Sequence, residues 1–151
     1  MQELNLEATV TNIPAVTDFV NAILEELDCP IQVQLQIDVA IDELFSNIAQ
    51  YAYAPGTGPA TVRVETEQDP RAVILTFIDR GMPYDPLAAE DPDITAPAEE
   101  RSIGGLGVFL VKKTMDDVCY EYREGQNILR IMKRIEHDPG AFPYGNGEKQ
   151  S

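Results

Sequence analysis

The chain has 151 residues, of which 44% are hydrophobic and 25% charged, and its formal net charge is -15. That length suits one domain with a single core, and the acidic balance excludes general nucleic-acid binding, because binding to phosphates needs a basic face. The sequence has no run of about 18 apolar residues, the length that spans a membrane, and its start, Met1-Gln2-Glu3-Leu4, lacks the basic residues of a secretory signal.

The first third of the chain predicts one strand and two helices. Apolar and polar residues alternate at the start of residues 2–11, which suits an edge strand. Asn12 and Pro14 then mark a helix start, at the cap and first-turn positions that favour them. The apolar stripe of this helix is predicted to be Phe19, Ala22, Ile23 and Leu27. A second helix is predicted over residues 31–53, with a stripe at spacings of three and four formed by Ile37, Ile41, Leu44 and Ile48.

The rest of the chain predicts four further strands and one helix. The breaker Pro55-Gly56-Thr57-Gly58-Pro59 ends the second helix. Strands are predicted over residues 60–67, 72–78, 117–122 and 127–134. Between the two pairs, a loop over 80–103 precedes a helix over 105–116. This order of elements predicts an α+β fold in two layers, with the helices on one face of a mostly antiparallel sheet.

Composition divides the chain into one domain and a tail. Residues 1–136 are predicted to form a single domain. Residues 137–151 are rich in Pro, Gly and polar residues, which predicts a disordered tail.

Two features of composition bear on location and partners. Cys29 and Cys119 lack metal-site spacing, so they are expected to be free thiols in a reducing, cytoplasmic compartment, packed as small hydrophobes. Residues 1–62 contain nine acids and no Lys or Arg, whereas residues 101–136 hold seven bases and five acids. A solubilising surface explains most of these acids. The alternative is an acidic N-terminal face that binds a basic partner protein.

Three short segments carry the residue types of a nucleotide site. The first is Asp42-Glu43-Leu44-Phe45-Ser46-Asn47, where Glu43 and Asn47 are four residues apart and therefore project from one side of the predicted helix. An amide oxygen suits Mg²⁺, which binds through one or two protein oxygens and phosphates. A carboxylate one turn away suits the activation of an attacking hydroxyl. The alternative, for any single pair of this kind, is a solvated helix face.

The second segment, Asp79-Arg80-Gly81-Met82-Pro83, follows an apolar strand. Asp79 would suit an acceptor for the exocyclic amine of a base, and Gly81 would let a ligand ring approach the backbone closely. The alternative is a simple turn, because Asp and Gly favour turns.

The third segment, Gly104-Gly105-Leu106-Gly107, opens the helix predicted over 105–116. Backbone amides at the positive end of a helix can cradle phosphates. Arg101, Lys112 and Lys113 place positive charge near this segment in an otherwise acidic chain, which favours an anionic ligand. The alternatives are a flexible hinge for the glycines and an exposed helix face for Lys112 and Lys113.

Taken together and in this order, the segments resemble the three nucleotide-binding boxes of the GHKL (Bergerat-fold) ATPase superfamily. Within it the chain resembles the small anti-sigma-factor serine/threonine kinases of bacteria, over about residues 3–135. The N box corresponds to residues 42–53, the first glycine box to residues 79–86 and the second to residues 104–111. Tyr51 stands where relatives usually have His.

The resemblance implies a Bergerat-type sandwich and a role for each matching residue. Asn47 would hold Mg²⁺ at the ATP phosphates, and Glu43 would be the catalytic general base. Asp79, with Gly81 beside it, would bind the adenine amino group. Residues 86–103 would form a mobile ATP lid. Further nucleotide contacts are implied for Tyr51, Arg101, Gly104, Gly105, Leu106 and Gly107.

The resemblance also implies an activity and its partners. The chain would be an ATP-dependent protein serine/threonine kinase that phosphorylates a serine of a small anti-sigma-factor antagonist. It would also bind a sigma factor, commonly as a homodimer. Two alternatives stay open: an ATP-binding regulatory module that transfers no phosphate, and a kinase whose client is not a sigma factor.

Overall fold

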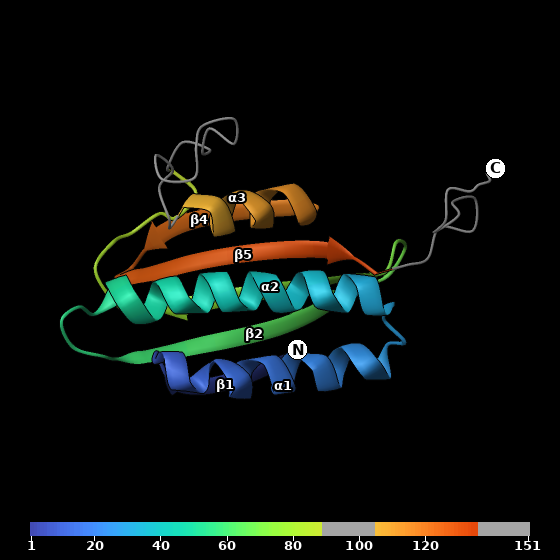
Figure 1. Cartoon of the computed structure of the whole chain (residues 1–151), viewed down its shortest axis with the longest axis horizontal. Helices are drawn as coiled ribbons and strands as arrows, with labels where there is room; N and C mark the ends of the chain where they lie inside the picture. Colours follow the sequence, from blue (N-terminus) through green and yellow to red (C-terminus); the bar gives the residue numbers. More distant parts are fainter. Residues whose placement is uncertain (89–104, 136–151) are drawn as a thin grey trace.

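The computed structural model describes residues 1–88 and 105–135, which fold into two layers (Figure 1). The sheet has the strand order β1-β2-β3-β5-β4, and all neighbours are antiparallel. Its strands are β1 (Gln2–Glu7), β2 (Pro59–Glu67), β3 (Ala72–Asp79), β4 (Asp117–Arg123) and β5 (Gln126–Arg134). The helices α1 (Ile13–Glu26), α2 (Ile31–Asn47) and α3 (Gly105–Thr114) lie on one face. The predicted fold class is therefore confirmed.

The core lies between the sheet and the helices. Residues of β2 alternate, with Ala60, Val62 and Val64 buried and the intervening side chains more exposed. The strand β3 lies in the middle of the sheet, and it is buried at most positions. The alternation in β2 is what a sheet with one covered face requires. Within the described residues, no helix is long and apolar enough to cross a membrane.

Helix α1 begins where the sequence predicts, but its buried face differs from the predicted stripe. Asn12 occupies the cap position, although its side-chain amide donates to the Glu7 carbonyl at 2.8 Å instead of capping the helix. Ala22 is exposed, so its place in the stripe was wrong. Packing against α2 and the sheet selects the neighbouring face, whose buried residues are Val16, Val20, Ile23 and Leu24.

Helix α2 is the element that carries the first motif. All four residues of its predicted stripe are buried. The α-helical part ends at Asn47, and the chain continues as one π-helical turn, Ile48–Ala52 (η2). Single π turns inside helices are often found at functional sites.

Cys119 corrects one sequence prediction. Both cysteines are free thiols, as expected. Cys29 is half-buried, but Cys119 is exposed, so it does not pack as a core hydrophobe. The reason is its register on β4, an edge strand, where the neighbouring residues Val118 and Tyr120 turn toward the core instead.

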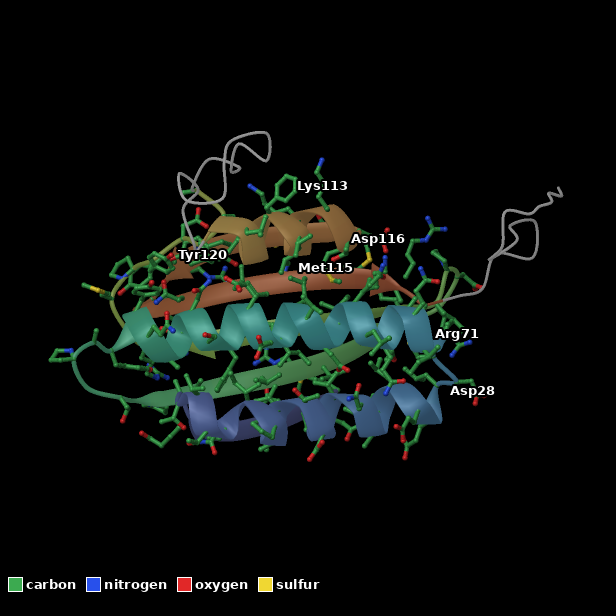
Figure 2. All side chains as sticks on the ribbon, viewed as in Figure 1. Asp28, Arg71, Lys113, Met115, Asp116 and Tyr120 are labelled. Atoms are coloured by element: carbon green, nitrogen blue, oxygen red, sulfur yellow. The ribbon has the colours of Figure 1, made fainter. Side chains whose placement is uncertain are left out.

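The two ends of the sandwich differ in what closes them. At one end the Arg71 guanidinium donates to the Leu27 carbonyl, which fastens the end of α1 to the β2–β3 turn. Figure 2 shows Arg71 and Asp28 together at this end and Tyr120 at the opposite one. The opposite end, where α2 ends and β5 begins, holds the predicted site residues.

Candidate functional site

Glu43 and Asn47 form a contacting pair on α2. The Asn47 amide nitrogen donates to Glu43 Oε2 at 3.4 Å, as the four-residue spacing predicts. Burial raises the pKa of the Glu43 carboxyl, the Asn47 hydrogen bond partly offsets this, and the negative charge of Asp42 adds to the rise. Glu43 is therefore a stronger base than an exposed glutamate.

The start of α3 lies directly against Glu43. A Cβ atom placed on Gly107 would collide with the carboxylate of Glu43, so any larger residue here would require the Glu43 side chain to move. The second glycine segment and the first motif therefore meet, although 64 residues separate Glu43 from Gly107 in the chain. The positive end of α3 is thereby placed next to a carboxylate, in the position where helix amides can receive anions.

Asp79 ends β3 as a buried carboxylate, only 4% exposed. It accepts hydrogen bonds from the Gly81 backbone amide at 2.9 Å and from the Asn127 side-chain amide at 2.8 Å. Both bonds end on Oδ1, which leaves Oδ2 for other donors. Burial raises the pKa of Asp79, and these two hydrogen bonds partly counteract the rise.

Gly81 allows two backbone segments to come close together. A Cβ atom here would collide with the carbonyl of Ala52, in the π-helical turn. The next residue, Met82, donates its amide to that carbonyl at 2.9 Å. The close approach at Gly81 is therefore made by the chain's own backbone, whereas the sequence suggested a ligand ring.

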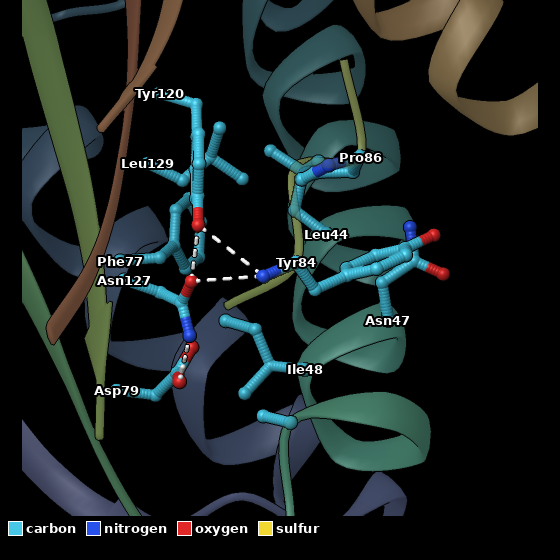
Figure 3. A pocket seen from close by; sticks show the side chains of 11 residues that line it. Leu44, Asn47, Ile48, Phe77, Asp79, Tyr84, Pro86, Tyr120, Asn127 and Leu129 are labelled. Atoms are coloured by element: carbon cyan, nitrogen blue, oxygen red, sulfur yellow. Dashed lines mark hydrogen bonds between the residues drawn. The ribbon is translucent and has the colours of Figure 1, made fainter. Parts of the chain in front are cut away.

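A pocket opens between α2 and the ends of β3 and β5 (Figure 3). Its apolar walls are Leu44, Ile48, Ala52, Phe77, Pro86 and Leu129. Its polar groups are Asn47, Asp79, Tyr84, Tyr120 and Asn127. Apolar walls with a few placed polar groups are typical of small-molecule sites. A buried carboxylate among apolar walls suits a flat heteroaromatic ring that carries an amine.

Asn127 joins the parts of this pocket, and sequence reasoning gave it no role. Besides Asp79, its amide nitrogen donates to the Met82 carbonyl at 2.9 Å. Its oxygen accepts from the Tyr120 hydroxyl and from the Tyr84 backbone amide, the latter at 3.2 Å. The signal that would have found it is the antiparallel register that places Asn127 opposite Asp79. That register comes from long-range pairing, which the local pattern does not contain.

We expect Asn127→Leu to destabilise the fold by about 2–4 kcal/mol. Leucine is similar in size, but it leaves the buried polar groups around it unpaired, at about 1–3 kcal/mol for each lost partner. Urea unfolding measures the change. Tyr120→Phe, which removes one hydroxyl from the same network, is the control and should cost less. Equal stability of Asn127→Leu and the wild type would mean that the network contributes nothing.

The remaining predicted site residues have mixed outcomes. Tyr51 is 44% exposed and does not line the pocket, but its ring packs against that of Tyr84, with centroids 5.3 Å apart. Leu106 is 38% exposed at the start of α3, which begins at Gly105. Arg101 and Gly104 lie outside the described residues. So do residues 89–103 of the predicted lid and the predicted tail, 137–151.

Comparison with known proteins places the chain in a family. Residues 6–133 match the family of histidine kinase-like ATPase domains. The chain belongs to this family. Because the match covers the three motifs and most of the sheet around them, the predicted GHKL-type assignment is confirmed.

Similar proteins include two named bacterial kinases. The serine/threonine-protein kinase BtrW of Bordetella bronchiseptica is 30% identical over 100 residues, which are 66% of this chain and 70% of BtrW. The serine-protein kinase RsbW of Bacillus cereus is 30% identical over 104 residues, which are 66% of this chain and 63% of RsbW. The chain thus matches slightly less than two thirds of the length of RsbW. The predicted activity, a serine/threonine-protein kinase, agrees with both names.

A solved structure is similar in fold. It contains the RsbU and RsbW domains of Rv1364c from Mycobacterium tuberculosis. The TM-score is 0.62 at 17% identity, and the match covers 91% of this chain and 34% of that one. This likeness supports the fold alone, and it agrees with the two-layer sandwich described above.

Proposed function

We propose that the chain is an ATP-dependent protein serine/threonine kinase of the bacterial cytoplasm that acts in a partner-switching system. Its substrate would be a serine of a small anti-sigma-factor antagonist, and its second partner a sigma factor. The observation that carries this proposal is the placement of the Glu43–Asn47 pair. It lies between the pocket that ends at Asp79 and the glycine-bearing start of α3.

The adenine of ATP would occupy the apolar pocket. Asp79 would accept a hydrogen bond from the exocyclic amine, through the oxygen that Gly81 and Asn127 do not use. Phe77, Leu44 and Leu129 would contact the faces and edges of the ring. A buried carboxylate in this position would discriminate against a base that presents a carbonyl there, because two acceptors would then face each other.

The phosphates would lie toward α3, with Mg²⁺ held by Asn47. The Asn47 nitrogen is engaged by Glu43, so the amide oxygen is left for a cation. Among the described residues no cluster of three or more His, Cys, Asp or Glu offers an all-protein site, which fits an ion that takes several of its ligands from phosphates and water. When bound, Mg²⁺ supplies charge neutralisation at the phosphates.

Glu43 would act on the incoming serine. Its carboxylate would accept the hydroxyl proton as the serine oxygen bonds to the γ-phosphorus, the bond from that phosphorus to the β–γ bridging oxygen breaks, and ADP leaves. The rise in its pKa caused by burial suits that task near neutral pH. Asn47 orients this carboxylate by its hydrogen bond, and Gly107 leaves the room that the carboxylate occupies.

Incubation of the chain with ATP labelled at the γ-phosphate and a cognate antagonist tests the proposed activity. The proposal predicts phosphoserine on the antagonist. The rival function, an ATP-binding module that regulates a partner without chemistry, predicts bound nucleotide and an unlabelled antagonist.

Gly107→Ala should lower the rate of phosphoryl transfer by about tenfold or more. The added methyl group overlaps the Glu43 carboxylate and would push it from its place, and small displacements of a catalytic group are costly. Single-turnover kinetics measure the effect. Gly56→Ala is the matched control, because its new Cβ would lie 3.6 Å from the nearest atom, an ordinary contact. Full activity of Gly107→Ala would show that the carboxylate need not stay where it lies.

The acidic outer face of α1 is the proposed contact for the sigma factor. Asp18, Glu25 and Glu26 are exposed on this helix, in the part of the chain that has no Lys or Arg. Affinity for the sigma factor should fall several-fold between about 0.1 M and 0.5 M salt, because ions screen exposed charges. A Glu25→Gln, Glu26→Gln double variant should flatten this dependence. An affinity that does not change with salt would argue against the acidic contact.

The proposal includes a homodimer, as the resemblance implies. Sedimentation of the purified chain would measure it directly. A client other than a sigma factor would leave the nucleotide chemistry unchanged and alter only the second partner.

A further inference from the structure

An apolar groove between α2 and α3 lies on the outer surface of the helical layer, outside the nucleotide pocket. Its lining carries no charge and consists of Gln32, Leu35, Gln36, Val39, Leu110 and Thr114. The three large aliphatic side chains are 56%, 50% and 44% exposed, in chain order. They form one contiguous patch, and contiguous apolar patches mark interaction sites more often than scattered exposed residues do.

The groove leads to Glu43. Leu35, Val39 and Glu43 follow one another at four-residue spacing on α2, so they lie along one face, about 6 Å apart at each step. The helix α3 runs antiparallel beside α2 (Figure 1). Its start at Gly107 lies against Glu43, and Leu110 lies in the groove with Val39. One end of the groove therefore opens beside the Glu43 carboxylate.

The charged residue nearest to the groove on α3 points elsewhere. Lys113 projects from the side of α3 away from α2 (Figure 2), and its ammonium lies 5.4 Å from the centre of the Phe109 ring. Along its six lining residues the groove therefore offers a partner apolar and uncharged polar groups, and the Glu43 carboxylate lies at its end. The partner's contacting surface should itself be apolar and uncharged.

We infer that the groove docks the protein substrate, through an apolar segment adjacent to its acceptor serine. This inference rests on the proposed kinase function. A serine that reaches Glu43 brings its flanking residues to within a few ångströms of the carboxylate. The nearest part of the groove, at Val39, lies one helical turn from Glu43, about 6 Å away. Six lining residues are also far fewer than the roughly 20–30 a side of a stable interface. A small contact suits a substrate that leaves after each transfer better than a second copy of this chain.

The test compares two groove variants, Val39→Gln and Leu110→Gln, with a matched control. Val10→Gln is that control, because Val10 is 54% exposed, as Val39 is 50%, but lies in the turn before α1. Each anti-sigma-factor antagonist encoded in the source genome is purified and phosphorylated by the full chain with Mg-ATP. We expect the groove variants to raise KM for the phosphorylated antagonist about tenfold. The turnover number and the Kd of ATP should not change, and the control should match the wild type.

Two outcomes of the kinetic test would overturn the inference. KM values within twofold of the wild type in both groove variants would place the docking surface elsewhere. Conversion of a wild-type dimer to a monomer by Val39→Gln would make the groove a self-association surface.

If the wild type phosphorylates no antagonist, the proposed function fails. Binding of the antagonist to the wild type and to Val39→Gln then tests the groove separately. Tenfold weaker binding to Val39→Gln would then uphold docking, whereas equal binding, or none to either protein, would overturn it.

Discussion

Replacing Glu43 by glutamine is expected to lower the turnover number for phosphoryl transfer by about 10²–10⁴-fold, the usual contribution of a general base. Glutamine keeps the shape of the side chain and can still contact Asn47, so the loss would come from the missing basic oxygen. Single-turnover transfer from labelled ATP to the antagonist measures the effect. The Kd of ATP should stay close to that of the wild type, because Asp79 and the apolar pocket are untouched.

The pH dependence gives this prediction a second readout. Burial raises the Glu43 pKa, and a base acts only when deprotonated, so the wild-type rate should fall as the pH drops through that raised pKa. This acidic limb should disappear in Glu43→Gln. Glu67→Gln, which alters an exposed glutamate at the end of β2, should retain both the rate and the limb. A Glu43→Gln variant with the wild-type rate would remove Glu43 from the chemistry.

Replacing Asn47 by alanine is expected to weaken binding of Mg-ATP by about 100-fold, which corresponds to about 2.7 kcal/mol. The variant removes the amide oxygen proposed to hold Mg²⁺ and the hydrogen bond that orients Glu43. Calorimetry with Mg-ATP measures the loss. Asn5→Ala is the matched control, since it removes an exposed amide from β1, at the far edge of the sheet.

A parallel titration in EDTA separates the metal from the rest of the site. If Asn47 acts through Mg²⁺, wild type and Asn47→Ala should bind metal-free ATP with similar affinity. An unchanged Kd for Mg-ATP would refute the role of Asn47. A loss of the same size with and without the metal would mean that the amide contacts the nucleotide itself.

Features set by local periodicity could be predicted from the sequence. The stripe of α2 and the side-by-side placement of Glu43 and Asn47 follow from helix geometry, because residues four apart share a face. The alternation of β2 likewise predicts which of its side chains enter the core. The stripe of α1 was partly wrong at Ala22, since the buried face depends on how the helix packs, and several apolar residues compete for it.

Contacts between distant parts of the chain could not be predicted from local patterns. Asn127 faces Asp79 because β5 pairs with β3, and nothing near residue 127 in the sequence reveals that partner. Gly107 and Glu43 meet because α3 packs on α2, which the order of the elements alone does not specify. The resemblance to a known family supplied the idea that the three motifs form one site. The structure adds the positioning role of Asn127 and the groove beside Glu43.

The nucleotide site is tested most directly by a crystal structure of the full chain with Mg²⁺ and a non-hydrolysable ATP analogue. The account predicts the adenine in the pocket with its amine bonded to Asp79, the cation on the Asn47 oxygen, and the γ-phosphate between Glu43 and the start of α3. An analogue bound elsewhere, or adenine in the pocket with its phosphates directed away from Glu43, would contradict the account.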